Sequence, residues 1–580
     1  MSTRSPPSGD ASAELAALEP RVLDHFFELQ PGVAVFLGLH AYDGRVWDPS
    51  RGFTERWAAQ ARRLLEGLQH VAPELLPPAQ RLDRHLLRLL LEGPLFDLEE
   101  GRVYDRNPMT VLGPISVTSY LVREYAPAPQ RARAVVATLE AVPRLLEEGR
   151  RRLDAHLPRP FLTLTESMAS GLPGHFAEAE AFVHGADPSL GGRFASARSA
   201  AEAALDAFMT RLRTDYAPRA NDDFALGRER FQRLLWVREG MTLPVEELLQ
   251  QGMEDLRRNQ ARLQALAAAS RPARDVPALL EETLKDHPTA AELLPRAQAL
   301  VLETRAFVKA RRLVTIPEPD HCRVEETPVY GRALSTASMN PPGPFEAGGD
   351  EGVYYVTPVD PAWTPKQTEE WLRSFNDGLL RNITVHEVYP GHYLQFLHLR
   401  RSGGSRTRKV FVSDAFTEGW AHYAEQLAVE NGLDGGSVRA QVAQLHDALL
   451  RDVRLLVSIG LHTQGRDLEW ATTLFQTEAY FERLPSEREA IRGTFNPEYF
   501  CYTLGKLAIL DARAKYLGPR FGGSLQRFHD ALLAQGAPPV GLLDELWVQL
   551  WGVPPEKAGP AAPAGTGPAA WGATAPTRPP

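Results

Sequence analysis

Two short motifs in the second half of the chain constrain its fold more than any other feature. They are HEVYPGHYLQ at residues 386–395 and EGWAHYAE at residues 418–425. A catalytic zinc ion takes three protein ligands, typically His nitrogens and a carboxylate, and keeps a further position open for water. His386, His392 and Glu418 can supply those ligands. We therefore predict one Zn²⁺ site per chain, built from two helical segments.

The spacing of the two histidines requires the first helix to break. His386 and His392 are six residues apart, and six residues turn about 600° on a regular helix, so the rings would face different directions. Pro390 removes a backbone donor, and Gly391 tolerates backbone angles that other residues avoid. We expect a bulge at these two residues that brings His392 back towards His386.

Other acidic and basic side chains accompany the three ligands. Glu387 follows the first histidine, where a metallohydrolase needs a carboxylate that takes a proton from the attacking water. On the second helix Glu418, His422 and Glu425 share one face, so periodicity leaves the third ligand open between Glu418 and His422. Glu425 lies two turns beyond Glu418, and we expect it to orient a ligand or to form a structural ion pair.

The two motifs resemble the paired signature of a large, mostly bacterial family known as domain of unknown function 885, HExxPGHxxQ followed by EGWAxYxE. That family is similar to helical zinc peptidases of the gluzincin type, such as thimet-like oligopeptidases and Taq-type carboxypeptidases. The resemblance implies a mainly α, two-lobed, zincin-like metallopeptidase fold with a small β-sheet beside the active-site helix. It also favours Glu418 as the third ligand, with His422 and Glu425 behind the ligands.

The resemblance extends to segments nearer the C-terminus. It suggests Tyr502 and His462 as donors to the oxyanion that forms during amide hydrolysis, although both residue types are more often packing residues. Arg492 could bind a substrate carboxylate with its planar guanidinium, or equally form a structural salt bridge. One departure concerns Ser458-Ile459, which stands where the family pattern has Asp-Thr.

The composition of the chain argues against some classes of binding partner. The net charge is −9 with a pI near 6.0, and no long basic run occurs, which argues against nucleic acid or a membrane surface as a partner. Cys322 and Cys501 are too few for a disulfide framework and are not spaced as zinc ligands. The N-terminus lacks the apolar core of a signal peptide, so we expect a cytoplasmic protein. The sequence leaves the oligomeric state open.

Composition and hydrophobic periodicity divide the chain into four parts. The ends are rich in Pro with Ser or Ala, and cannot bury enough apolar surface to order themselves. Amphipathic helical periodicity dominates most of the remainder. We predict a disordered N-terminus at 1–12, a helical lobe at 13–310, a catalytic zincin-like region at 311–554 and a disordered tail at 555–580.

A small sheet is predicted just upstream of the first motif. Four short β-prone runs broken by Pro and Gly lie at residues 313–316, 322–324, 328–330 and 352–357. We take residues 353–357 as a candidate edge strand that pairs with a substrate backbone, with Tyr355 contacting substrate. The alternative is a strand buried for packing alone.

Start signals for helices flank the motifs. Thr364 followed by Pro365 and Gln367 predicts a helix that begins at Pro365. Ser413 or Asp414 is expected to begin the helix of the second motif, and the polar, Gly-rich residues 400–409 are expected to form a loop.

Together these observations predict a zinc-dependent hydrolase that cleaves amide bonds in short peptides, with Glu387 as general base. Two alternatives stay open: a metal-dependent hydrolase of a non-peptide small-molecule amide, and a helical binding or scaffold protein without catalysis. Open metal coordination and turnover separate them, because a structural zinc is usually closed by four protein ligands, whereas a catalytic zinc keeps a water.

Overall fold

A computed structural model describes residues 8–272, 274–332, 335–348 and 351–551. The predicted disordered tail at 555–580 and the first seven residues of the predicted disordered N-terminus lie outside this range. Residues 8–12 are helical, contrary to that prediction, because α1 (Ser8–Leu29) begins at Ser8 and turns apolar side chains such as Ala11 and Leu15 into the core. The fold is mainly helical with one small sheet.

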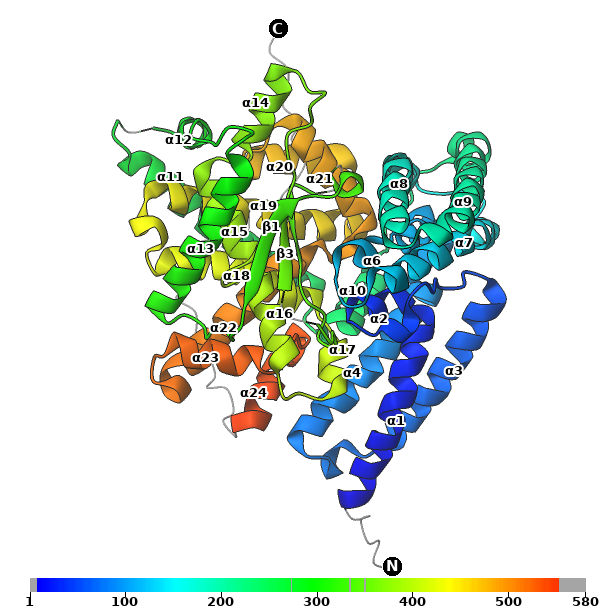
Figure 1. The fold of residues 1–580 in the computed structure, drawn as a ribbon. Coiled ribbons are helices and arrows are strands. Elements are labelled where there is room, and N and C mark those ends of the chain that lie inside the picture. The colour runs from blue at the N-terminus through cyan, green and yellow to red at the C-terminus, as the bar shows by residue number, and fades with distance from the viewer. Residues whose placement is uncertain (1–7, 273, 333–334, 349–350, 552–580) are drawn as a thin grey trace, which may run out of the picture.

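The N-terminal helices gather on one side of the molecule, coloured blue to cyan in Figure 1. Apolar residues at helical spacing give each long helix a buried stripe, which the neighbouring helices cover. These helices are α1, α2 (Pro31–Phe36), α3 (Arg51–His70), α4 (Pro78–Leu95), α5 (Val103–Arg106), α6 (Thr118–Val122), α7 (Ala128–Arg152), α8 (Arg159–Ala186) and α9 (Gly191–Arg211).

The next helices lead into the other half of the molecule: α10 (Arg228–Glu239), α11 (Val245–Ala269), α12 (Val276–Leu284) and α13 (Leu293–Arg311). Within this group α11 packs along α19 (Val438–Thr463), and α13 packs on the sheet. These residues therefore associate with the region that carries the two motifs. One hydrophobic core draws buried residues from both halves, and the predicted lobe boundary at residue 310 stays a prediction.

The sheet has three strands, β1 (His321–Glu326), β2 (Ala337–Asn340) and β3 (Glu351–Val356), in the order β1-β3-β2. β1 runs parallel to β3, and β2 runs antiparallel to it. The predicted small sheet is confirmed, but the predicted edge strand is wrong: β3 is central, with both of its hydrogen-bonding edges taken. Tyr355 on β3 is only 5% exposed.

Two of the four predicted β-runs do not form strands. Residues 313–316 are irregular, and Val329–Gly331 is a short 3-10 turn. The strand that sequence reasoning missed is β2, whose residues Ala-Ser-Met-Asn have weak β propensity. Its pairing with β3 supplies the strand conformation that its own residues do not favour.

The helices around the motifs are α14 (Pro365–Arg373), α15 (Asp377–Glu387), α16 (His392–Arg401), α17 (Arg406–Val410) and α18 (Asp414–Glu430). The predicted start at Pro365 is confirmed by a reciprocal cap between Thr364 and Gln367. The predicted start of α18 is confirmed by the Ser413 cap. The expected loop at 400–409 is partly helical, because Ser405 caps α17.

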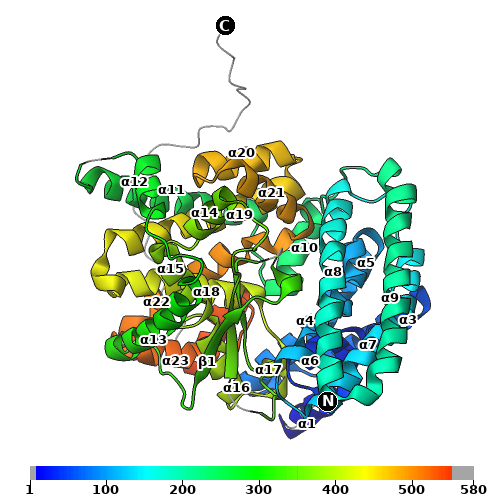
Figure 2. The ribbon, with the colours of Figure 1, turned by 45° about the horizontal axis from the view of Figure 1, so that its top comes forward.

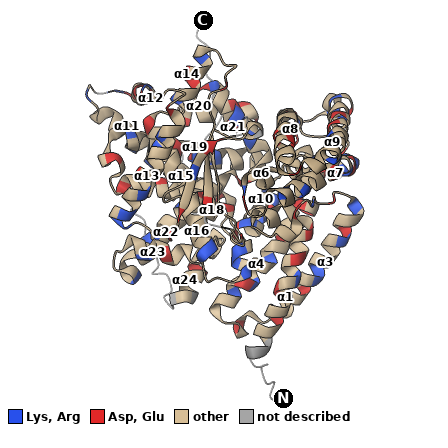
Figure 3. Cartoon of the chain, in the orientation of Figure 1, with Lys and Arg blue, Asp and Glu red and all other residues tan. Residues whose placement is uncertain are grey.

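The C-terminal helices complete the region: α19, α20 (Leu468–Glu478), α21 (Arg483–Phe495), α22 (Cys501–Phe521), α23 (Leu525–Leu533) and α24 (Leu543–Trp551). Most residues of α18 and α19 are buried, and α18 packs against α22 near the middle of the molecule (Figure 2). Acidic and basic residues are interspersed over the described chain (Figure 3). None of its described helices combines the length and apolar character needed to cross a membrane.

Candidate metal centre

The expected break separates α15 from α16. Val388 leaves helical geometry, with a φ of −118° and a ψ of −79°. The chain then folds back so tightly that a Cβ on Gly391 would lie 1.7 Å from the His386 carbonyl oxygen. Trp420 on α18 fixes this turn, because its indole N–H donates to the Pro390 carbonyl at 2.8 Å. Only glycine fits at position 391, and the turn places His392 beside His386.

Three side chains converge at this break. The Nε2 atoms of His386 and His392 each lie 3.4 Å from the same Glu418 carboxylate oxygen, Oε2. One ligand atom from each residue lies within 4.8 Å of the other two, and the imidazole rings are 88° apart. Among the described residues, no further His, Cys, Asp or Glu joins this metal cluster of His386, His392 and Glu418.

The spacing of these atoms fits a zinc ion. Ligand atoms bound tetrahedrally at about 2.0–2.1 Å lie about 3.3 Å from one another, close to the two separations in the metal cluster. Glu418 Oε2, the atom that faces both Nε2 atoms, is also buried without a hydrogen-bond partner in the described part of the chain. Buried polar atoms are normally paired, so this oxygen points to a cation as the missing partner.

Glu425 lies directly behind the metal cluster. Its carboxylate is fully buried and contacts His386 Nδ1 at 2.6 Å, His422 Nδ1 at 3.2 Å and the Arg451 guanidinium at 3.2 Å. Burial raises the pKa of Glu425, but Arg451 and His422 outweigh it and hold the pKa well below its usual range. An ionised Glu425 fixes the His386 tautomer and leaves Nε2 free for a metal.

The candidate ligand His422 is not part of the metal cluster. It is fully buried, and its Nδ1 contacts Glu425 at 3.2 Å. Burial lowers the pKa of His422 to about 4, and the nearby Lys506 ammonium adds to this shift, so its ring is neutral. The geometry therefore favours Glu418 as the third ligand.

Glu387 ends the helical turn that carries His386. Burial raises the pKa of its carboxyl, against the opposing effect of the His386 and His392 imidazoles. The carboxyl is not among the three converging ligand groups. It therefore lies next to the metal cluster without being one of its three ligand groups.

Tyr502 is brought to the metal cluster by close packing of α18 on α22. A Cβ on Gly505 would lie 1.7 Å from the Ala415 carbonyl, and one on Gly419 would lie 2.3 Å from the Gly505 backbone. Tyr502 stands almost one turn before Gly505. Burial raises the pKa of its hydroxyl, and the nearby Glu418 carboxylate raises it further. The hydroxyl therefore stays protonated and can donate.

His462 lies elsewhere. Its Nε2 contacts the Gly493 carbonyl at 2.9 Å, and its ring stacks on Phe231 at 6.3 Å between centroids. It follows Arg451, which contacts Glu425, by 11 residues of one helix, or about 16 Å. These contacts favour a packing role for His462, and its assignment as an oxyanion donor stays a prediction that they do not support.

The departure from the family pattern at Ser458-Ile459 has a local structural role. Ser458 is buried, and its hydroxyl donates to the Pro497 carbonyl at 2.6 Å. This bond ties α19 to the turn that precedes Tyr502. Ser458 thus helps position the segment that carries the candidate oxyanion donor.

Sequence reasoning missed two arginines on α19. Arg451 pairs with Glu425, and Arg454 lies 5.0 Å over the Tyr502 ring. Neither belongs to a motif, and no local signal in the sequence links either to a partner on another helix. Arg492, the predicted carboxylate-binding residue, lies 5.4 Å over the Tyr499 ring.

Over residues 31–546 the sequence matches the family described as a bacterial protein of unknown function, DUF885. The chain belongs to this family. A solved structure from Shewanella oneidensis, described as a candidate lipoprotein of unknown function, is similar to this DUF885 chain, with 22% sequence identity and a TM-score of 0.73. The match covers 92% of this chain and 99% of the Shewanella chain. A candidate lipoprotein from Colwellia psychrerythraea is similar with 18% identity and a TM-score of 0.77, covering 93% and 99%.

At these identities the likeness extends to the fold alone. No curated protein matches the DUF885 chain. A peptidase activity and a cytoplasmic location therefore stay predictions, and the chemistry has to be argued from the metal cluster itself.

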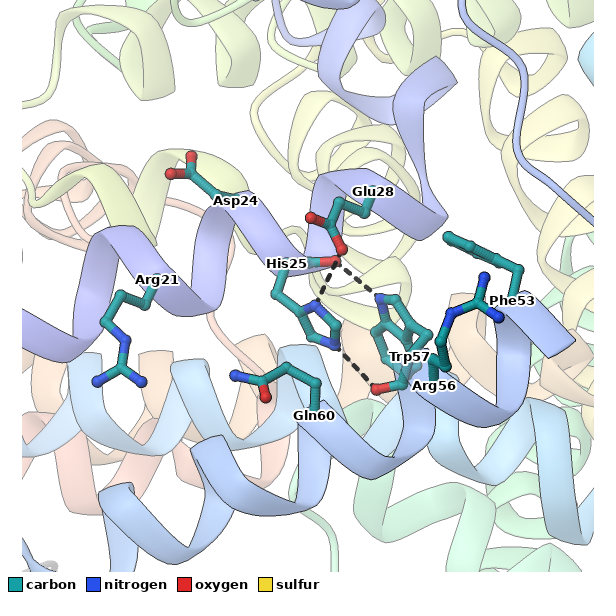
Figure 4. Close-up of a pocket in the computed structure, with 8 residues that line it drawn as sticks. All are labelled: Arg21, Asp24, His25, Glu28, Phe53, Arg56, Trp57 and Gln60. Atoms are coloured by element: carbon teal, nitrogen blue, oxygen red, sulfur yellow. Dashed lines mark hydrogen bonds and ion pairs between the residues drawn. The ribbon is translucent and has the colours of Figure 1, made fainter.

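A second polar site of the DUF885 protein lies far from the metal cluster in the sequence. It is a surface groove between α1 and α3 of about 440 Å³ (Figure 4). His25 Nδ1 contacts Glu28 at 3.2 Å, and His25 Nε2 contacts the Trp57 carbonyl at 2.9 Å. The groove is lined by Arg21, Asp24, His25, Glu28, Phe53, Arg56, Trp57 and Gln60. Because both ring nitrogens have protein partners, His25 offers no metal ligand.

Proposed function

We propose that this DUF885 protein is a zinc-dependent hydrolase that cleaves amide bonds in short peptides. The observation that carries the proposal is the convergence of His386, His392 and Glu418 on one point, with Glu425 fixing the first histidine from behind. In this proposal the mainly helical fold with a sheet beside the metal helices is a zincin-like peptidase fold.

The number of ligands favours catalysis over a structural role. Three protein ligands leave a coordination position open, whereas structural zinc sites are usually closed by four. A zinc ion held here supplies Lewis acidity and brings the pKa of water close to neutrality. The scaffold alternative needs neither property.

Two side chains are assigned the proton transfer and the oxyanion stabilisation that amide hydrolysis needs. Glu387, whose pKa is raised by burial, takes a proton from the attacking water and returns it to the leaving amine. Tyr502, protonated beside Glu418, donates to the oxygen that gains negative charge at the scissile carbonyl. Each role uses an atom close to the metal cluster.

Substrate backbone fits best at β2. In the described sheet β2 pairs with a strand on one side only and packs against α15 and α16, which carry both histidines. The other edge strand, β1, packs against α13 instead. An extended peptide added to the free edge of β2 lies beside the metal helices. The proposed peptide-binding strand is therefore β2 rather than β3, the strand expected from the sequence.

Metal analysis combined with a peptide digest tests the proposal. The purified protein is expected to hold one zinc per chain and to cleave members of a mixed short-peptide library, as followed by mass spectrometry. A chelator should stop cleavage, and added zinc should restore it. Zinc retention without cleavage of any peptide, tested beside a panel of small amides, would favour one of the two alternatives.

A further inference from the structure

Three arginines surround two tyrosines on the side of the metal cluster formed by α19, α21 and the start of α22. Arg454 lies between the rings, 5.0 Å from the centre of Tyr502 and 5.1 Å from that of Tyr499. Arg451 lies 5.9 Å from the Tyr502 ring. Arg492, on α21, lies 5.4 Å from the Tyr499 ring. Tyr502 and Tyr499 thus each lie against guanidinium groups, and Arg454 lies against both rings.

The first two arginines are neutralised by carboxylates. Arg451 pairs with Glu425 at 3.2 Å and with Asp447 at 3.1 Å. Arg454 makes two parallel bonds to Glu489, at 2.7 and 2.8 Å. Glu489 also accepts the Tyr499 hydroxyl at 2.6 Å, so three donors share this carboxylate.

Arg492 is different. Its half-buried guanidinium rests on the Tyr499 ring but makes no hydrogen bond or ion pair with any side chain in the described residues. Partial burial of an unpaired charge is unfavourable unless a ligand supplies the partner. The planar fork of an arginine matches a carboxylate with two parallel bonds, and stacking on an aromatic ring holds the fork in place.

We propose that Arg492 binds the terminal carboxylate of the peptide substrate, so that the enzyme shortens peptides from their C-terminal end. This inference rests on the proposed function and names its substrate class: short peptides with a free C-terminus. The bond broken is an amide bond close to that terminus. Water supplies hydroxide to the acyl carbon and a proton to the leaving amine, so the products are a shortened peptide and a free amino acid or dipeptide.

The structural alternative is that Arg492 only supports Tyr499. The two roles predict different effects of changing Arg492. A residue that only supports Tyr499 affects all substrates equally, whereas a carboxylate-binding residue affects only substrates with a free C-terminus. The test uses one peptide made with a free C-terminus and with a C-terminal amide. The wild-type protein should cleave the free acid with a kcat/KM about 10- to 100-fold higher, the range expected for a hydrogen bond to a charged group.

Arg492→Gln should remove this preference by raising KM for the free acid, with little change for the amide. Arg492→Lys should restore part of it, because lysine keeps the charge without the fork. The matched control is Arg488→Gln, which removes the same charge from an exposed position one turn earlier on α21. It should leave both substrates unchanged.

A binding measurement keeps the inference independent of turnover. Zinc-loaded Glu387→Gln protein should bind the free-acid peptide more tightly than the amide by calorimetry, and adding Arg492→Gln should remove the difference. Equal binding of both peptides, or equal loss for both on changing Arg492, overturns the inference. Absence of cleavage of any peptide by the wild-type protein, with the binding preference intact, overturns the proposed function instead.

Discussion

A contacting His-Glu pair with the same spacing occurs both behind the metal cluster and in the groove between α1 and α3. His25 and Glu28 contact each other at a spacing of three residues on α1, as His422 and Glu425 do on α18. In the groove, both nitrogens of His25 already have protein partners. In the metal cluster, two imidazoles and a carboxylate face one another, and Glu418 Oε2 has no hydrogen-bond partner among the described residues. Unsatisfied atoms that converge, rather than a His-Glu pair, indicate a cation site.

The backbone differs between the two regions as well. Both His25 and its partner lie within one continuous helix, α1. The metal cluster depends on the break between α15 and α16, which Gly391 permits and Trp420 fixes. Ligands six residues apart reach one ion only because the helix is interrupted.

The largest difference between the regions should appear in turnover. Glu387→Gln preserves shape but cannot accept a proton, so peptide cleavage should fall by about 10²- to 10⁴-fold while zinc is retained. Glu28→Gln, the matched change in the groove, should alter neither property. The test is to measure the zinc content and the peptide cleavage rate of each variant. Near-normal turnover of zinc-loaded Glu387→Gln would exclude Glu387 as the base.

Gly391→Ala tests the backbone break. The new Cβ would lie 1.7 Å from a backbone oxygen, so the turn has to move, and we expect a loss of roughly 3 kcal/mol in the free energy of unfolding together with weaker zinc binding. The control is Gly32→Ala in α2, where no atom lies within 4 Å of the added Cβ. Chemical denaturation measures both. Equal stability of the two variants would show that the turn is not constrained.

Glu425→Gln tests the support behind His386. Partners of metal-bound histidines typically contribute 10- to 100-fold to metal affinity, so zinc dissociation should become faster and zinc affinity should fall by about that factor. Glu28→Gln makes the same change beside His25 and should leave zinc binding unchanged. Competition with a zinc-binding dye measures the affinity. If both variants bind zinc like the wild type, Glu425 has a structural role only.

A smaller effect concerns a contact between the N-terminal helices and the segment after β2. His40 stacks on Tyr125 and contacts Asp43 at 3.0 Å and Glu346 at 2.7 Å. Burial lowers the pKa of His40, but the two carboxylates outweigh it and raise the pKa to about 9.

Because the folded-state pKa exceeds the unfolded value, the stabilisation from His40 is complete below about pH 6.5 and is lost as the pH rises through 9. His40→Gln should therefore lower the free energy of unfolding on the order of 2 kcal/mol at pH 6 and have little effect at pH 10. His70→Gln, on the exposed end of α3, is the surface control. A loss that does not change with pH would contradict the ionic contact.

Features with local causes could be predicted from the sequence. Pro390 and Gly391 determine the break between the two histidines, and Ser413 and Thr364 determine where two helices begin, because each acts on residues within one turn. The metal cluster belongs to this group only in part: the motifs named its candidate ligands, but periodicity left Glu418 and His422 open, and the packing of α18 brings Glu418 to the two histidines.

Features set by distant contacts could not be predicted. β3 is central because β2, a strand of weak propensity, covers its second edge. Arg451 reaches Glu425 from a different helix, and His462 lies about 16 Å further along that same helix. Only the packing of α15, α18 and α19 determines which of these side chains face the metal cluster.

The central claim is that His386, His392 and Glu418, without His422, hold a catalytic zinc ion. The most direct measurement is the zinc content and zinc affinity of purified wild-type protein, Glu418→Ala and His422→Leu. We predict one zinc per chain in the wild type, loss of more than about 100-fold in affinity for Glu418→Ala, since even partners behind a ligand contribute 10- to 100-fold, and retained zinc in His422→Leu. A wild-type protein that binds no zinc, or a His422→Leu site that is empty while the Glu418→Ala site stays filled, would contradict the account.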